Sequence, residues 1–114
     1  MAIGVDIEDI ERFKGKSEEF LHRVFTDLEL EYCLKFSKPE SHLAARFCAK
    51  EAVVKALTAL EISGISYNEI EVFHNENMCP NIRILKPLEK NIIFQLSVSH
   101  DRTKAVAFVT AEVQ

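Results

Sequence analysis

The stretch that decides the fold is residues 41–60, SHLAARFCAKEAVVKALTAL. It contains no glycine or proline and is rich in alanine and leucine, which are strong helix formers. Its apolar side chains fall nearly all the way round a helix, and a helix that is apolar on every side is a buried one. We therefore predict a long central helix on which the rest of the chain packs.

The segments before this stretch predict one strand and two short helices. Residues 2–7 are apolar and indicate a strand, and residues 17–25 have a helical pattern. Thr26 and Glu29 have the spacing of a capping box, in which each side chain accepts a free N–H at a helix start. We expect this box to begin a helix that Pro39 ends.

The segments after Gly64 alternate between apolar and polar residues, which is typical of strands. The predicted strands are residues 70–72, 82–84, 92–99 and 105–113. The last two are joined by only a short polar connection and should form an antiparallel hairpin. Helices followed by strands predict an α+β fold, with residues 1–114 as a single domain.

Length, charge and cysteine content exclude several classes of protein. A net charge of −4 argues against a general nucleic-acid binder, which needs a basic surface. No run of about 18 apolar residues is present to cross a membrane, and no basic segment of a secretory signal begins the chain. The three widely spaced cysteines predict reduced thiols, and the isolated histidines predict no zinc site. We expect a cytoplasmic protein that binds neither nucleic acid nor membrane.

Two groups of charged residues are candidates for chemistry. Asp6 lies in an apolar strand, where a carboxylate needs a cation or hydrogen-bond donors; it is either a structural ion pair or helix cap, or a ligand. The charges of the central helix are Arg46, Lys50, Glu51 and Lys55. They are either surface charges with a Glu51–Lys55 pair, or a site where a carboxylate binds Mg²⁺ and the cations neutralise a phosphate.

A third group, at the end of a predicted strand, consists of Ser97, Ser99, His100 and Asp101. A Ser–His–Asp triad is conceivable, but adjacent residues rarely fold back into triad geometry, and no GxSxG elbow is present. A hydrogen-bonding or phosphate-contacting role for His100 is favoured.

Three blocks of this sequence closely resemble those of holo-[acyl-carrier-protein] synthases, the small bacterial class of 4′-phosphopantetheinyl transferases. The blocks are GVDI (residues 4–7) with RF (12–13), ARFCAKEAVVKA (45–56) and LSVSHD (96–101). They occur in the family's order, in a chain of the family's length, and the middle block is the most specific. The resemblance implies a phosphopantetheinyl transferase-like fold, with a long buried helix packed on antiparallel strands.

The resemblance also implies an activity. Such enzymes transfer 4′-phosphopantetheine from coenzyme A to a serine of apo acyl carrier protein, for fatty acid biosynthesis, and release adenosine 3′,5′-bisphosphate. It assigns Asp6 and Glu51 as ligands of Mg²⁺. Lys55 would either stabilise the negative charge that develops or assist the leaving group, so these three are the expected catalytic residues. The base for the serine could be a water on the metal or a site carboxylate, and the sequence leaves this open.

The resemblance further implies the binding residues and the assembly. Arg46, Lys50 and His100 are candidates for contacts to the phosphates of coenzyme A. Arg12 matches a position that meets the acidic carrier protein, and Arg23 is either a second such contact or an ordinary exposed charge. Family members of this size are homotrimers with active sites between neighbouring subunits.

Two segments depart from the family pattern. Residues 57–61, LTALE, stand where the family has a glycine-containing turn, so either a contact to coenzyme A is lost or the helix runs one turn longer. Residues 77–81, NMCPN, keep only the proline of a Gly-Lys-Pro turn. These changes are compatible with a second alternative, a non-catalytic paralogue that binds coenzyme A or carrier protein. A Mg²⁺-dependent phosphohydrolase is a third alternative.

Overall fold

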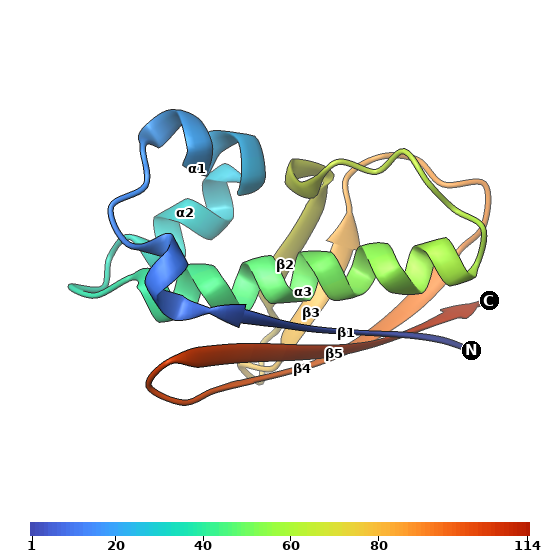
Figure 1. Ribbon diagram of the computed structural model, residues 1–114. Coiled ribbons are helices and arrows are strands. Elements are labelled where there is room, and N and C mark those ends of the chain that lie inside the picture. Colours follow the sequence, from blue (N-terminus) through green and yellow to red (C-terminus); the bar gives the residue numbers. More distant parts are fainter.

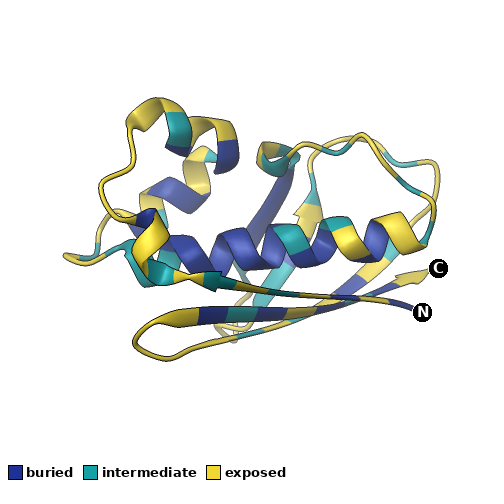
Figure 2. Ribbon diagram, viewed as in Figure 1, coloured by how far each residue is buried: buried dark blue, intermediate teal, exposed yellow.

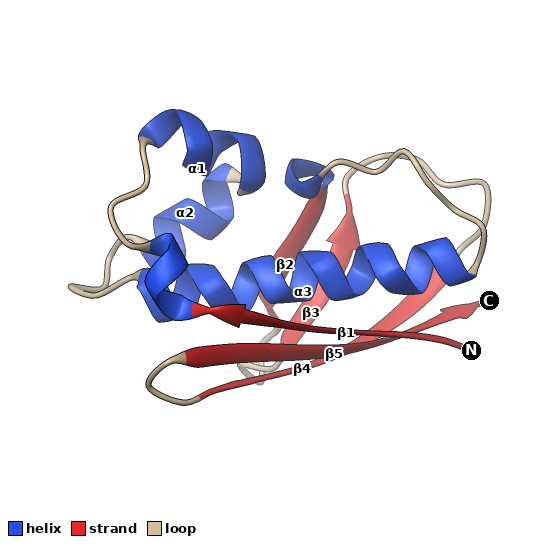
Figure 3. Cartoon of the chain, viewed as in Figure 1, coloured by secondary structure: helices blue, strands red, loops and turns tan.

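A computed structural model describes all of residues 1–114 (Figure 1). The helices are α1 (Glu18–Val24), α2 (Asp27–Cys33) and α3 (Glu40–Ala59), with two 3-10 turns, η1 (Ile10–Phe13) and η2 (Tyr67–Glu69). The strands are β1 (Ala2–Asp9), β2 (Ile70–His74), β3 (Pro80–Ile84), β4 (Ile92–His100) and β5 (Lys104–Val113). Helix α3 lies at the centre, as predicted. Strands β1, β5 and β4 lie along one side of it, and α1 and α2 cover one end (Figure 3).

The strands form two separate antiparallel sheets. The three-stranded sheet has the order β1-β5-β4, and β2 pairs only with β3. The predicted hairpin is β4–β5, in which Ser97 lies opposite Phe108. Strand β1 joins the other edge of β5 and places Asp6 opposite Ala107. The α+β class and the antiparallel strands packed on a long helix are confirmed.

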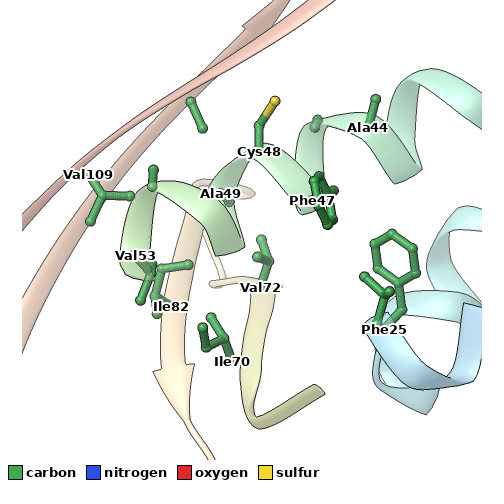
Figure 4. Packing of buried hydrophobic residues seen from close by; sticks show 14 of the residues in the cluster. Phe25, Ala44, Phe47, Cys48, Ala49, Val53, Ile70, Val72, Ile82 and Val109 are labelled. Carbon is green, nitrogen blue, oxygen red and sulfur yellow. The ribbon is translucent and has the colours of Figure 1, made fainter. Parts of the chain in front are cut away.

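The core lies between α3 and the two sheets (Figure 2). Every residue from 43 to 50 on α3 is buried, which confirms that this helix is apolar nearly all round. Figure 4 shows Cys48, Ala49 and Val53 of α3 between Val109 of β5 and the β2–β3 hairpin. The many small side chains of α3 let the strands approach the helix backbone closely.

The closest approach is between β1 and α3, at Gly4. A Cβ atom on Gly4 would lie 1.9 Å from the carbonyl oxygen of Ala52, so only glycine fits there. Because side chains alternate along a strand, residues 2, 4, 6 and 8 of β1 face the helix. The glycine therefore brings Asp6, two residues later, against α3.

The structure also corrects one expected element end and decides one open alternative. The capping box of Thr26 and Glu29 begins α2 as predicted, but α2 ends at Cys33, well before Pro39. Helix α3 ends at Ala59 and does not run a turn longer. Its end is closed by hydrogen bonds from Glu61 N to Thr58 O and from Ile62 N to Leu57 O, both 2.9 Å long. This Schellman arrangement holds Glu61 at φ +63°, a conformation that usually takes glycine.

All three cysteines are free thiols, as predicted; Cys33 and Cys48 are buried and Cys79 is exposed. None of the helices combines the length and the apolar character that crossing a membrane requires.

Candidate active site

Asp6 has one carboxylate oxygen paired and one without a partner. Lys55 Nζ lies 3.2 Å from Asp6 Oδ1 and also donates to the carbonyl of Val5 at 2.9 Å. The side chain of Asp6 is only 10% exposed, and its Oδ2 is buried with no hydrogen-bond partner. The structural ion pair is therefore real, but it leaves a desolvated carboxylate oxygen that a cation would satisfy.

Glu51 lies one helical turn before Lys55 but does not pair with it. Its Oε1 instead accepts a hydrogen bond from the hydroxyl of Tyr67, in η2. This hydrogen bond, together with burial, raises the pKa of Tyr67 to about 12, so the hydroxyl remains a donor at neutral pH. The sequence analysis missed Tyr67, because no spacing or motif relates position 67 to position 51.

The donor chemistry of Asp6 and Glu51 fits a hard cation. Carboxylate oxygens are the ligands that Mg²⁺ prefers, and it commonly takes one or two of them together with substrate phosphates and water. The unpaired Asp6 Oδ2 supports this fit. No cluster of three or more histidine, cysteine or acidic side chains is placed to hold a metal, so a cation here would have to draw its other ligands from a bound molecule and from water.

Glu8 and Arg12 continue this face of the molecule. Burial, and then the neighbouring Asp6, raise the pKa of Glu8. Arg12 Nη1 donates to Glu8 Oε1 at 2.6 Å, and its guanidinium lies 5.1 Å from the centre of the Phe47 ring. Arg12 is thus held against Glu8, at the edge of the group formed by Asp6, Glu51 and Lys55 (the carboxylate group), but is half-exposed. Arg23, on α1, is largely exposed. Its Nη1 forms a long ion pair, 3.9 Å from Glu19 Oε1, as expected of an ordinary surface charge.

Lys50 is not brought to this group, although it is the neighbour of Glu51 in sequence. It is completely buried, and its Nζ lies 2.7 Å from Glu29 Oε1. It also donates to the carbonyls of Tyr67, at 2.8 Å, and Ile70. An ammonium has three donors, and all three of these donors are taken by the protein. The structure therefore leaves Lys50 no donor for a phosphate of coenzyme A.

Arg46 lies on the other side of α3. It is nine residues before Lys55, which puts the two on opposite sides of a helix with 3.6 residues per turn. Its guanidinium lies 4.3 Å from the centre of the Tyr32 ring, and its Nε is buried with no hydrogen-bond partner. It lines a hollow of about 410 Å³ together with Lys35, His74 and Arg83. This hollow can receive an anion.

His100 lies at the end of β4, in a second hollow, of about 580 Å³, with Lys38, Ser41 and Arg102. It forms no triad, because its ring nitrogen Nδ1 lies 3.1 Å from the backbone oxygen of Asp101. The carboxylate of Asp101 accepts instead from backbone N–H groups of the β4–β5 turn. The structure thus separates the predicted site residues: Asp6, Glu51 and Lys55 belong to the carboxylate group, Arg46 and His100 each line a hollow of their own, and Lys50 lies in neither place.

Comparisons with known proteins identify the family of this chain. Residues 2–109 match the family described as the 4′-phosphopantetheinyl transferase superfamily. The chain belongs to this superfamily. It is similar to the holo-[acyl-carrier-protein] synthase of Thermodesulfovibrio yellowstonii, with 42% identity over 111 residues and 94% of each chain covered.

Two solved structures share the fold of this transferase. A Bacillus anthracis holo-(acyl-carrier-protein) synthase in complex with CoA (3′,5′-ADP) superposes with a TM-score of 0.82 at 30% identity, covering 99% of this chain and 96% of the other. The Neisseria meningitidis synthase superposes with a TM-score of 0.82 at 32% identity and covers 97% of both chains. The chain is therefore an enzyme of the holo-[acyl-carrier-protein] synthase kind.

Proposed function

We propose that the chain transfers 4′-phosphopantetheine from coenzyme A to a serine of apo acyl carrier protein and releases adenosine 3′,5′-bisphosphate. The observation that carries this proposal is the buried, unpaired Oδ2 of Asp6. Asp6 pairs through its other oxygen with Lys55, which lies one helical turn after Glu51 on α3. The coenzyme A complex of the Bacillus anthracis synthase supports the identity of the donor. The relatives' names support the acceptor.

Asp6 and Glu51 would hold Mg²⁺, which, when bound, offsets the negative charge of the donor's pyrophosphate. Lys55 already lies against Asp6, with its side chain half-exposed, and can donate to the departing phosphate. The serine of the carrier protein is the nucleophile, so this chain needs none of its own. Its role is to bind and orient the two substrates and to neutralise the negative charge of the phosphates.

Arg46 and His100 would bind phosphates of coenzyme A, Arg46 in the hollow that it shares with Lys35 and Arg83. His100 would do so in the second hollow, where Lys38 and Arg102 lie beside Glu40 and Asp101. One ligand cannot easily reach both Arg46 and Lys55 of the same chain, because they lie on opposite sides of α3. A site shared between neighbouring subunits removes this difficulty. We therefore carry Arg46 and His100 into the proposed function and leave out Lys50.

A homotrimer is the assembly we propose. The face of the β1-β5-β4 sheet turned away from α3 exposes Ile3, Val5, Ile7 and Phe108, which are 44% to 62% accessible. An apolar patch this continuous marks a protein interface, and cyclic association of identical chains would cover it. Light scattering should report a trimer for the wild type and smaller species for Phe108→Asp; a monomeric wild type would contradict the assembly.

The carrier protein and the compartment complete the proposal. Carrier proteins are acidic, and half-exposed Arg12 at the edge of the carboxylate group is the contact we assign first, with Arg23 as a weaker one. We place the reaction in the cytoplasm, since the free cysteine thiols suit a reducing compartment. The resemblance to the synthases places it in fatty acid biosynthesis.

The test is an intact-mass assay. The protein is mixed with coenzyme A, Mg²⁺ and an apo acyl carrier protein, and the intact mass of the carrier protein is measured by mass spectrometry. We expect a gain of one phosphopantetheine unit, equimolar release of adenosine 3′,5′-bisphosphate, and loss of both in EDTA. Binding of coenzyme A with no mass gain on several carrier proteins would favour the non-catalytic paralogue instead.

A further inference from the structure

We propose that Tyr67 is a positioning residue for Glu51: its hydroxyl holds Oε1 of the carboxylate and leaves Oε2 as the oxygen presented to a cation. This inference rests on the proposed function, because it takes Glu51 as a ligand of that cation. Tyr67 itself touches neither substrate nor metal in this account. It acts through the hydrogen bond that it donates to Glu51.

Tyr67 can do this because its main chain is fixed to the same turn of α3. The carbonyl of Tyr67 accepts from the buried ammonium of Lys50 at 2.8 Å, while its hydroxyl binds the next residue of the helix, Glu51. Lys50 is itself held by Glu29, 2.7 Å away. Two adjacent helical residues thus hold the main chain and the side chain of one tyrosine.

The ring of Tyr67 is fixed as well. It packs on Phe47 of α3, with the ring centres 5.3 Å apart and the planes inclined by 54°. Ser66 and Glu69 cap the short η2 turn on which the tyrosine sits. The hydroxyl is therefore presented to Glu51 from a rigid base.

The consequence concerns the affinity for the cation. A free glutamate side chain must lose rotamer freedom when it coordinates a metal. A hydrogen bond from a rigid donor removes that freedom before the metal binds. Residues that hydrogen-bond to metal ligands act in this way, and mutating such a residue typically weakens metal binding by 10-fold to 100-fold. Phenylalanine at position 67 keeps the ring and removes only the hydroxyl.

The experiment measures Mn²⁺ binding by Tyr67→Phe, in the presence of saturating coenzyme A and without carrier protein. Free Mn²⁺ is followed by electron paramagnetic resonance, at a temperature where circular dichroism shows both proteins folded. We expect the dissociation constant of Mn²⁺ to rise roughly 10-fold. Ser63→Ala, which deletes an exposed hydroxyl in the loop after α3, should bind Mn²⁺ like the wild type.

The outcomes separate this inference from the function beneath it. A wild type that binds Mn²⁺ and modifies carrier protein, beside a Tyr67→Phe variant of equal Mn²⁺ affinity, would overturn only the role of Tyr67. A wild type that binds no Mn²⁺ in the presence of coenzyme A would overturn the proposed function and this inference with it.

Discussion

Replacing Lys50 by methionine distinguishes a structural role of this residue from a ligand-binding role. Methionine has a similar length but no charge. In the structure Lys50 and its partner Glu29 are both inaccessible to solvent, and the ammonium also binds two backbone carbonyls. Burial lowers the pKa of Lys50, and Glu29 opposes this shift, so the charged state depends on the carboxylate beside it. We therefore expect Lys50→Met to destabilise the fold.

The size of the destabilisation follows from the buried carboxylate of Glu29, which loses its cation. Without the ammonium, Glu29 remains buried with only the N–H groups of Thr26 and Val72, at 2.8 and 2.7 Å, as donors. Breaking one side of a buried ion pair costs about 3–5 kcal/mol. The total stability of a domain is roughly 5–15 kcal/mol. With a urea dependence of about 2 kcal/mol per molar, the unfolding midpoint should fall by about 2 M.

The assay is urea unfolding followed by circular dichroism, with Lys50→Met beside the wild type. Adding Glu29→Gln to Lys50→Met removes the uncompensated charge and should restore part of the lost stability. A Lys50→Met midpoint within about 0.3 M of the wild type, which corresponds to about 0.6 kcal/mol, together with weakened coenzyme A binding, would refute this reasoning. That result would restore the role that the sequence suggested for Lys50.

Three further predictions concern other parts of the molecule. Glu61→Gly should raise the melting temperature by roughly 4 °C, because the left-handed conformation costs other residues about 1 kcal/mol; scanning fluorimetry measures this, and a decrease would contradict it. Burial, and then Arg46, lower the pKa of both His42 and His74. Because the unfolded chain takes up these protons first as the pH falls through about 6.5, stability is lost toward acid. The double variant His42→Gln/His74→Gln should lose less melting temperature than the wild type between pH 7 and pH 5, and an equal loss would count against this. Arg12→Ala should raise the KM for carrier protein roughly threefold, as expected for an exposed charge pair, and leave the KM for coenzyme A unchanged; steady-state kinetics that show the reverse would remove Arg12 from the docking surface.

Local patterns were enough to predict most of the fold. Apolar periodicity located α3 within one residue at each end, and the alternation in residues 92–99 predicted β4 and its hairpin with β5. The end of α2 was missed because Pro39 sets only an outer limit on that helix. The chain instead leaves the helix after Cys33 and turns over residues 34–39 before α3 begins.

The site was predictable only in part, because contacts between residues far apart in the sequence produce no local sequence pattern. The motif blocks singled out Asp6, Glu51 and Lys55, and the structure brings Asp6 and Lys55 together although they are 49 residues apart. The roles of these residues remain predictions. The helical spacing could not reveal that Lys50 is buried against Glu29, or that Tyr67 holds Glu51.

The most direct test of the central claim compares Asp6→Asn with Asp9→Asn. Both are aspartates of β1, but Asp6 faces α3 beside Lys55, whereas Asp9 is exposed and pairs with Lys104. The measurement is the initial rate at which each variant adds phosphopantetheine to apo acyl carrier protein, by intact mass, with saturating coenzyme A and Mg²⁺. We expect Asp6→Asn to lose at least about 100-fold, since a bound cation contributes several kcal/mol to such transfers, and Asp9→Asn to stay close to the wild type. An Asp6→Asn variant that matches the Asp9→Asn rate would contradict the account.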